Sequence, residues 1–354
     1  MRKILTNNAQ EGMILAKSIY SVNGYVLLGE GIPLKQIYIS KLQNYNISEI
    51  YINDEISKDI EVNDVIKDQT RTEAKGLVKK VMEDYTKNKR FNSDGSKIIV
   101  NRIIDELLAN RDLIINLSDI KSVDDYTFSH SVNVCVLSLI TGIRLGLDQL
   151  KLRDLGVGAL LHDIGKVMIP EEILKKPSSL TDEEYEQIKE HTVLGYTIVK
   201  TDPNVKVTSA NVILSHHERY DGTGYPRQIK GEEIHLFARI VAIADVYDAL
   251  SSDRAYKKKL KTYEAIEYLN AYGLTFFDND ILQCFIKSIP IYAIGTSVLL
   301  STGEKGIVAD TNSNFPTRPI VRIIYQANGT RNSSFEEIDL TNRLNVVIID
   351  SCEI

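Results

Sequence analysis

Short apolar runs separated by turn residues occupy both ends of the chain. In residues 12–52 the runs MILAKSIYSV, YVLLG and SEIYI appear, and the first two flank Asn23-Gly24, a dipeptide that favours a two-residue hairpin turn. After Pro290 come SVLLS, GIVAD, PIVRIIYQ and VVIID, with a second Asn-Gly pair at 328–329. The pattern predicts a small β-rich module at each end.

The middle of the chain has apolar residues at helical spacing. Residues 63–120 carry long charged stretches with apolar positions three or four apart, which predicts helices with solvated charged faces. Thr181, followed three residues later by Glu184, predicts a capping box and a helix that contains His191.

Two later segments, DLGVGALLHDIGK and LFARIVAIADVYDAL, are apolar nearly all round. Such segments predict buried helices. The first would carry His162 and Asp163 to an interior wall, and the second would carry Asp245 and Asp248.

Taken together, the patterns predict an α+β multidomain protein with a central all-α helical bundle flanked by β-rich modules. A chain of 354 residues is long for a single core, which agrees with several domains. The predicted parts are an N-terminal β-rich module at 1–62, a helical connector at 63–120, a helical domain at 121–289 and a C-terminal β module at 290–354. The connector is a candidate contact for a homodimer.

Composition narrows the classes of partner and compartment. A net charge of −6 and a pI near 5.7 argue against a nucleic acid polymer as partner, because such proteins need a basic face. Three widely spaced cysteines indicate a reducing compartment. The start lacks the apolar core of a signal peptide, and no apolar run approaches the roughly 20 residues of a membrane span. We therefore expect a cytoplasmic protein.

The histidines are confined to the predicted helical domain. The chain has six: His130, His162, His191, His216, His217 and His235. Burying imidazoles and carboxylates without partners costs about 2–7 kcal/mol for each neutral polar group, and a bound metal would offset this cost. Imidazole and carboxylate ligands without a nearby thiolate favour iron, manganese or a similar divalent ion over a structural zinc.

The adjacent pair His162 and Asp163 suggests a site for two ions. Neighbouring helical residues point about 100° apart, so the imidazole would bind one ion while the carboxylate reaches a second. Two such ions clamp an in-line phosphoryl displacement. Lys166 would neutralise a phosphate oxygen, and Arg254 and Lys257 would form a second cationic cluster, although a run such as KKKLK is by itself more often a solvated face. The spacing of Gly and Gly-Lys in GALLHDIGK excludes a P-loop.

Four separated motifs resemble one known family. HDIGK, the downstream His191, HHERYDGTGYP and ADVYDALSSDRAY follow one another as in the HD-GYP subgroup of the HD superfamily, which consists of metal-dependent phosphodiesterases that linearise cyclic di-GMP. The resemblance covers residues 124–289. It implies an HD-type helical bundle, and the β-rich ends look like modules that accompany this domain in Gram-positive relatives.

The resemblance also implies roles for single residues. The implied metal ligands are His130, His162, Asp163, His191, His216, His217 and Asp245, with Asp163 bridging two ions and acting in catalysis together with Lys166. The implied substrate-binding residues are Lys166, Asp221, Gly222, Gly224, Tyr225, Arg254 and Lys257. Glu218 is expected beside the ligands rather than among them.

Three positions depart from the family pattern. Tyr126 stands where some members carry a glutamate that helps to bind a third ion, so we expect two divalent ions, iron or manganese. Gln228 and His235 replace a usual Gly and Pro after the GYP turn, and we expect His235 at the surface.

The expected function is hydrolysis of cyclic di-GMP to linear pGpG, with further cleavage to GMP left open. The two ions would lower the pKa of a bound water from about 15.7 toward 7 and so supply a hydroxide nucleophile. Three alternatives stay open: a receptor that binds a cyclic dinucleotide with weak or no cleavage, a phosphodiesterase for another cyclic dinucleotide such as cyclic GMP-AMP, and a di-iron oxygenase.

Overall fold

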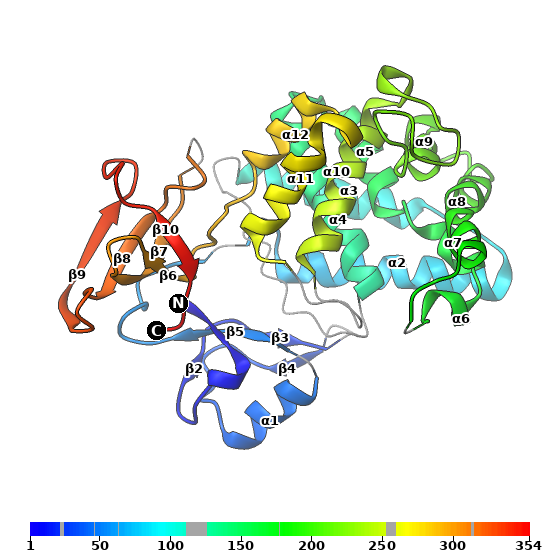
Figure 1. The fold of residues 1–354 in the computed structure, drawn as a ribbon. Helices are drawn as coiled ribbons and strands as arrows, with labels where there is room; N and C mark the ends of the chain where they lie inside the picture. The colour runs from blue at the N-terminus through cyan, green and yellow to red at the C-terminus, as the bar shows by residue number, and fades with distance from the viewer. Residues whose placement is uncertain are drawn as a thin grey trace. The chain divides into compact units, whose positions relative to one another are not determined.

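The computed structural model describes residues 1–21, 25–45, 47–62, 64–110, 126–176, 178–252, 260–312 and 315–354. The chain forms two compact units (Figure 1). The first unit combines both ends of the chain, Met1–Val65 and Ile289–Ile354. The second contains Ile66–Arg111 and Tyr126–Ser288.

The N-terminal part of the first unit is a small antiparallel sheet with one helix. Its elements are β1 (Arg2–Leu5), a 3-10 turn η1 (Thr6–Asn8), β2 (Ile14–Leu15), β3 (Ile19–Tyr20), β4 (Val26–Leu28), α1 (Gln36–Asn44) and β5 (Glu49–Asn53). Strands β1, β5 and β2 form one sheet in that order, and β3 pairs with β4. Residues Leu15, Ile39 and Ile50 belong to its apolar core.

Two of these elements, β1 and α1, have no clear pattern in the sequence and were not predicted. Strand β1 begins with Arg2 and Lys3, so it lacks the apolar alternation that predicts a strand. Helix α1 has only two buried residues, Ile39 and Leu42. The predicted Asn23-Gly24 turn lies outside the described residues, but β3 and β4 on either side of it pair antiparallel.

The C-terminal part of the first unit is a five-stranded antiparallel sheet. Its strands are β6 (Ser297–Leu300), β7 (Lys305–Asp310), β8 (Ile320–Tyr325), β9 (Arg331–Asp339) and β10 (Ile348–Ser351), in the order β10-β6-β7-β8-β9. The predicted turn at 328–329 is confirmed, because Gly329 has a φ of 80° and β8 pairs with β9. Strand β9 was missed because it is an edge strand with a largely exposed, polar sequence.

The two ends of the chain are joined by direct contacts within the first unit. The backbone N–H of Lys3 donates to the carbonyl of Gly295 at 3.0 Å. A guanidinium N–H of Arg2 donates to the carbonyl of Ile354 at 2.7 Å. The β-rich ends of the chain therefore fold as one unit. The domain boundaries at residues 62, 120 and 289 stay predictions.

The second unit is helical. Its helices are α2 (Asp68–Asn88), α3 (Asp94–Ala109), α4 (Tyr126–Arg144), α5 (Gln149–Leu160), α6 (Glu171–Leu174), α7 (Asp182–Lys189), α8 (His191–Val199), α9 (Val207–Ser215), α10 (Leu236–Ser251), α11 (Thr262–Phe276) and α12 (Asn279–Ile286). The 3-10 turns η3 (Ile164–Met168) and η4 (Gly231–Glu233) lie between these helices. The predicted fold class, a helical bundle with β-rich ends, is confirmed.

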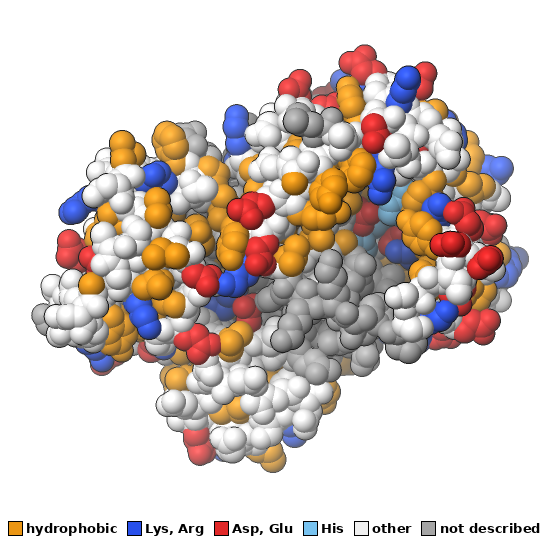
Figure 2. Space-filling view, in the orientation of Figure 1, with side chains coloured by type: hydrophobic (Ala, Val, Ile, Leu, Met, Phe, Trp, Pro, Cys, Tyr) orange, Lys and Arg blue, Asp and Glu red, His pale blue; other side chains and the backbone are white. Residues whose placement is uncertain are grey.

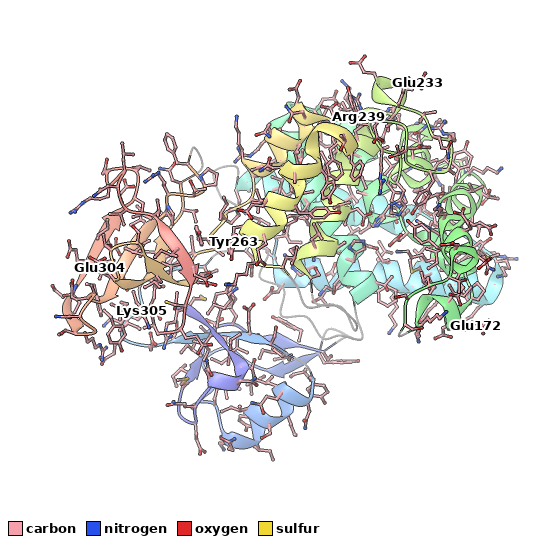
Figure 3. The ribbon with its side chains drawn as sticks, in the orientation of Figure 1. Glu172, Glu233, Arg239, Tyr263, Glu304 and Lys305 are labelled. Carbon is pink, nitrogen blue, oxygen red and sulfur yellow. The ribbon has the colours of Figure 1, made fainter. Side chains whose placement is uncertain are left out.

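Helix α4 lies at the centre of this bundle. It packs on α2, α5 and α10, and its residues Val132, Val134, Cys135, Val136, Leu137 and Leu139 have no exposed surface. Arg239 on α10, labelled in Figure 3, donates to the carboxylate of Asp278 at 2.6 Å and so joins α10 to the start of α12. Among the described residues, no helix has the length and apolar content of a membrane span.

Candidate metal centre

Three polar side chains enter the centre of the bundle from α4 and α10. His130 lies near the start of α4, and Asp245 and Asp248 lie in the second half of α10. The Nε2 atom of His130 is 3.0 Å from Oδ1 of Asp245, and its Nδ1 atom is 2.7 Å from Oδ2 of Asp248. All three residues are buried, so these contacts offset the cost of removing them from water.

The pair His162 and Asp163 follows directly after helix α5. Two glycines allow this turn to approach the start of α8. A Cβ atom on Gly165 would lie 1.9 Å from the carbonyl oxygen of His191, and one on Gly195 would lie 3.1 Å from the backbone nitrogen of Gly165. This close backbone contact places the His162–Asp163 turn beside His191.

His191 is the first residue of α8. The predicted capping box of Thr181 and Glu184 is confirmed at the start of α7. The prediction that one continuous helix contains His191 is wrong, because α7 ends at Lys189. The two helices pack differently: α8 is buried against η3 and α9, whereas α7 buries none of its residues.

His216 and His217 stand at the end of α9. His216 is the C-cap residue of this helix and is fully buried. The ring centroids of His216 and His217 are 4.2 Å apart. The paired histidines therefore reach the same site from one helix end.

Three of the histidines use Nδ1 to contact a backbone carbonyl. The distances are 2.8 Å from His162 to Ala159, 2.6 Å from His191 to Ile188 and 3.0 Å from His216 to Ile213. A carbonyl oxygen only accepts hydrogen bonds, so each Nδ1 carries a proton, and a neutral ring in this tautomer presents the lone pair of Nε2. Such a second contact commonly fixes the tautomer and orientation of metal-binding histidines.

These lone pairs converge on one another. The Nε2 atoms of His191 and His216 are 3.3 Å apart. Burial lowers the pKa of His191 to about 4 and the pKa of His216 well below its ordinary value, so both rings are neutral at pH 7. Two lone pairs that face each other without a proton between them repel, and a cation between them would convert repulsion into coordination.

Two further atoms in the site have unused hydrogen-bonding capacity. Among the described residues, Nε2 of His162 and Oδ1 of Asp163 are buried and make no hydrogen bond. Buried polar atoms are almost always paired, so these exceptions call for a ligand. Imidazole nitrogens and carboxylate oxygens are suitable donors for a divalent metal ion, and the residues therefore fit such an ion.

The donor atoms form overlapping groups whose members lie within 4.8 Å of one another. The groups are His191 with His216 and His217, His130 with His162 and Asp245, and His162 with Asp163 and His216. The carboxylate of Asp163 faces two of the neighbouring rings, with Oδ2 3.4 Å from Nε2 of His162 and Oδ1 3.5 Å from Nε2 of His191. One carboxylate thus lies between the first two groups.

The electrostatics of the site favour ionised carboxylates. Burial by itself would raise the pKa of Asp163, but Lys166 and His162 hold this pKa well below its usual range. Burial would lower the pKa of His130, but its contacts with Asp245 and Asp248 raise it to about 9. The carboxylates are therefore in the state that binds cations.

Lys166 and Tyr225 border the metal-binding groups. The ammonium of Lys166 lies 2.6 Å from Oδ2 of Asp163, and its side chain is 31% exposed. The ring of Tyr225 stacks on His217 with centroids 4.7 Å apart and an interplanar angle of 26°. Both predicted substrate-binding residues thus lie in contact with a predicted metal ligand.

The GYP turn needs its glycines for reasons of backbone geometry. Gly222 has a φ of 87°, and a Cβ atom on Gly224 would lie 2.3 Å from the backbone nitrogen of Arg219. Oδ1 of Asp221 accepts hydrogen bonds from the N–H and the hydroxyl of Thr223, at 2.9 and 2.7 Å. The carboxylate of Asp221 therefore shapes the turn itself.

The other predicted positions divide into two sets. Arg254 and Lys257 lie outside the described residues, as does the side chain of Tyr126. Glu218 is buried and accepts from the backbone N–H of Arg227 at 2.7 Å, which fixes the segment after the turn. His235 is half-buried, and it caps α10 by accepting from the N–H of Phe237, a role that the sequence did not indicate.

Asp248, Asn133 and Arg71 also belong to the site, and no role was predicted for them from the sequence. Asn133 donates to Oδ1 of Asp248 at 2.8 Å and accepts from Arg71 at 3.1 Å. The available signal was the spacing of Asp245 and Asp248, three positions apart on an apolar helix. For Asn133 and Arg71, the local sequence carries no comparable signal.

The centre is accessible from one face of the molecule. Figure 2 shows histidine side chains at the bottom of a hollow, between apolar side chains of the helical unit. Most of the ligand set is nevertheless buried, since His130, His162, Asp163, His191 and His216 each expose at most 3% of their surface. A small polar ligand can thus reach metal-binding groups that are otherwise shielded from water.

Family comparisons agree with this site. Residues 110–281 match the family model of the HD domain, and residues 297–354 match that of a KOW domain associated with the HD domain. The part of the helical unit that follows α3 therefore matches an HD domain, whereas α2 and α3 precede the match. The matched segment is thus an HD domain, and it carries the HDIGK and HHERYDGTGYP motifs of the HD-GYP group.

Several known proteins are similar to the chain. The cyclic di-GMP phosphodiesterase PA4108 of Pseudomonas aeruginosa is 35% identical over 72% of this chain and 61% of its own length. The 3′3′-cGAMP-specific phosphodiesterase 1 of Vibrio cholerae is 37% identical over 47% of this chain and 38% of its own length. The chain thus spans less than two thirds of either relative.

A solved structure shares the fold. Bd1817, an HD-GYP-type protein from Bdellovibrio bacteriovorus, superposes with a TM-score of 0.54 at 18% identity, covering 80% of this chain and 97% of that protein. At this identity the likeness concerns the fold alone.

Proposed function

We propose that this protein is a metal-dependent phosphodiesterase that hydrolyses cyclic di-GMP to linear pGpG. One observation carries the proposal: buried imidazole and carboxylate groups from separate helices converge with unused donor atoms, and the carboxylate of Asp163 lies between two such groups. The names of the relatives support the reaction, and the partial coverage of their length keeps it a proposal.

The proposed cofactor is a pair of divalent ions, iron or manganese. His130, His162 and Asp245 would hold one ion, and His191, His216 and His217 the other, with Asp163 shared. When bound, such ions activate water and stabilise negative charge on a phosphoryl group. The absence of thiolates from the donor groups supports iron or manganese over structural zinc.

The chain's own residues would position the substrate. Lys166 combines a contact to Asp163 with partial exposure, so its ammonium can meet a phosphate oxygen beside the ions. Tyr225 presents an aromatic ring next to His217, and Gly222 and Gly224 keep the turn narrow enough for a dinucleotide to approach its backbone. Roles for Asp221, Arg254 and Lys257 toward the substrate, a cytoplasmic location and a homodimer stay predictions.

The test is a cyclic dinucleotide assay on protein of known metal content. The full chain is purified without oxygen, its metals are quantified, and it is incubated with cyclic di-GMP in the presence of each divalent ion. We expect pGpG to form with iron or manganese, and chromatography over time shows whether GMP follows. Metal-loaded protein that binds cyclic di-GMP without cleaving it would be a receptor and would contradict the proposal.

A second substrate has a specific observation in its favour. The relative from Vibrio cholerae is named for 3′3′-cGAMP, which presents the same kind of phosphodiester. Parallel reactions with equal concentrations of the two dinucleotides compare kcat/KM directly. A preference for cyclic GMP-AMP would keep the reaction class and change the substrate, whereas oxygen consumption without dinucleotide cleavage would indicate an oxygenase.

A further inference from the structure

A buried chain of polar side chains leads away from the metal centre. His130 contacts Asp248 through Nδ1 at 2.7 Å, Asp248 accepts from Asn133 at 2.8 Å, and Asn133 accepts from Arg71 at 3.1 Å. The four residues expose between 1 and 5% of their surface. They come from three helices, α4, α10 and α2, and we call them the His130–Arg71 relay.

The chemistry of each partner fixes which group donates and which accepts in each hydrogen bond of the relay. A guanidinium only donates and a carboxylate only accepts, so the amide of Asn133 must turn its oxygen to Arg71 and its NH2 group to Asp248. The opposite orientation would place donor against donor and acceptor against acceptor. Arg71 and Asp248 therefore select the same amide orientation, and Arg71 stabilises the one that presents a donor to Oδ1 of Asp248.

Asp248 in turn orients the ring of His130. Its Oδ2 atom contacts Nδ1, which leaves Nε2 pointing toward Asp245, 3.0 Å from Oδ1. His130 and Asn133 are three residues apart on α4, so one face of this helix presents both to Asp248. Each oxygen of Asp248 is thereby assigned to a different side chain of the same helix.

The end of the relay is firmly anchored. Arg71 lies in the first turns of α2, and Glu106 on α3 accepts from the backbone N–H of Lys67 and the hydroxyl of Thr70 at 2.8 and 2.7 Å. These contacts fix the start of α2. Helix α2 also lies outside residues 110–281, the segment that matches the HD domain.

We propose that Arg71 is a positioning residue of the metal centre, which acts through Asn133 and Asp248 to orient the His130 ring toward the ion. The inference rests on the proposed metal site and extends it to a helix before the HD domain. It follows that the segment matched to the HD domain contains the metal ligands but lacks part of the apparatus that orients them.

The test measures metal binding separately from turnover. Equilibrium dialysis with Mn²⁺ is carried out on the full chain and on Arg71→Met, Arg71→Lys and Asp248→Asn. Changes to residues that orient a metal ligand typically weaken binding by about 10–100-fold. We expect Asp248→Asn to fall in this range and Arg71→Met to weaken the affected Mn²⁺ site about tenfold, with partial recovery in Arg71→Lys because it still donates to Asn133.

Val78→Ala is the matched control. Val78 is buried on the same helix α2 and lies outside the relay, so its truncation lowers stability without removing a polar contact. We expect its Mn²⁺ affinity to match that of the natural chain. Equal loss of affinity in Val78→Ala and Arg71→Met would reduce Arg71 to a general structural role and overturn the inference.

A double variant tests whether Arg71 acts through Asp248. If the two residues share one route, the affinity loss in Arg71→Met with Asp248→Asn is smaller than the product of the single losses. An affinity loss in the double variant that equals the product of the single losses would contradict the relay. Natural Mn²⁺ affinity in Arg71→Met would also contradict it. If the natural chain itself bound no Mn²⁺ or other divalent ion, the proposed function would fail first, and the two failures are thus distinguishable.

Discussion

Buried charged and polar groups differ in their hydrogen-bond partners between the two units of the chain. In the first unit, Arg322 donates to both oxygens of Asp59 at 2.5 and 2.8 Å and to Glu337 at 2.6 Å. In the helical unit, Nε2 of His162 and Oδ1 of Asp163 are buried without a hydrogen bond to any described residue. Fully paired buried groups stabilise a fold, whereas unpaired donors and acceptors that face one another mark a site for a ligand.

The two units also differ in what fills their cores. The sheet cores of the first unit consist of aliphatic side chains such as Leu15, Ile50, Val298 and Val321. The central helix of the second unit buries polar residues among its apolar ones. Polar groups in a helical core cost stability, so their convergence is the clearest indication that the helical unit carries the function.

The largest effect is expected when the negative charge of Asp163 is removed from the helical site. Asp163→Asn keeps the size of the side chain but removes the carboxylate that lies between the two donor groups. We expect metal content well below that of the natural chain and turnover about a thousandfold lower, because several kcal/mol of transition-state stabilisation depend on the ions. Metal quantification and the pGpG assay measure both, and natural values in the variant would contradict the proposed role.

A change of pH sharpens the contrast between the units. In the metal-free chain, burial lowers the pKa of His191 to about 4 and that of His217 to about 3. Unfolded histidines bind a proton near pH 6.5, so below this pH the unfolded state binds more protons than the folded state. Stability contributed by these neutral rings is present above pH 6.5 and is lost as pH falls toward 4.

The expected slope is about 1.4 kcal/mol per pH unit for each of the two groups. His130 acts with the opposite sign: its pKa is raised to about 9, so its contribution is fully present below pH 6.5 and is lost as pH rises through 9. Urea unfolding of metal-free protein at pH 6.5 and pH 5 measures the slope. The sequence of the first unit has no histidine, and the buried His216 contributes with the same sign, so a slope that is not reduced in a His191→Gln, His217→Gln variant would contradict this origin.

A backbone contact tests how the helical site is assembled. In Gly165→Ala the new methyl group would meet the carbonyl of His191, so the turn that carries His162 and Asp163 must move away from α8. We expect a loss of about 1–3 kcal/mol in the free energy of unfolding, together with weaker Mn²⁺ binding.

Gly76→Ala is the control for that substitution. Gly76 lies within α2, and a Cβ atom there would have no neighbour within 4 Å. We expect it to raise stability by about 0.5–1 kcal/mol, because alanine is the better helix former. Unchanged Mn²⁺ affinity in both variants would show that the glycine contact does not position the ligands.

The smallest expected effect concerns the paired charges of the first unit. Arg322→Met removes the hydrogen bonds to Asp59 and Glu337, whose side chains are 60 and 43% exposed and can regain water. We expect a loss of about 1–2 kcal/mol in stability, with turnover unchanged. Denaturant unfolding and the dinucleotide assay measure the two quantities, and a large loss of turnover would mean that the units are functionally coupled.

Much of the fold could be predicted because its elements have local patterns. The apolar segments around His162 and Asp245 predicted the buried helices α5 and α10, and the Asn-Gly pair predicted the turn at 328–329 after strand β8. Strand β9 was missed because its exposed polar residues do not alternate with apolar ones. The break between α7 and α8 was missed because it depends on how each helix packs, whereas their joint sequence favours one helix.

The sequence by itself determined which side chains are available, because the four ordered motifs carry the family resemblance that implies each proposed ligand. Only the tertiary structure decided that Nε2 of His191 faces that of His216, that Asp163 lies between two donor groups, and that Arg71 leads to His130. These relations join residues far apart in the chain. Their distances depend on how helices approach one another, as at Gly165 and Gly195, and no local pattern encodes such approaches.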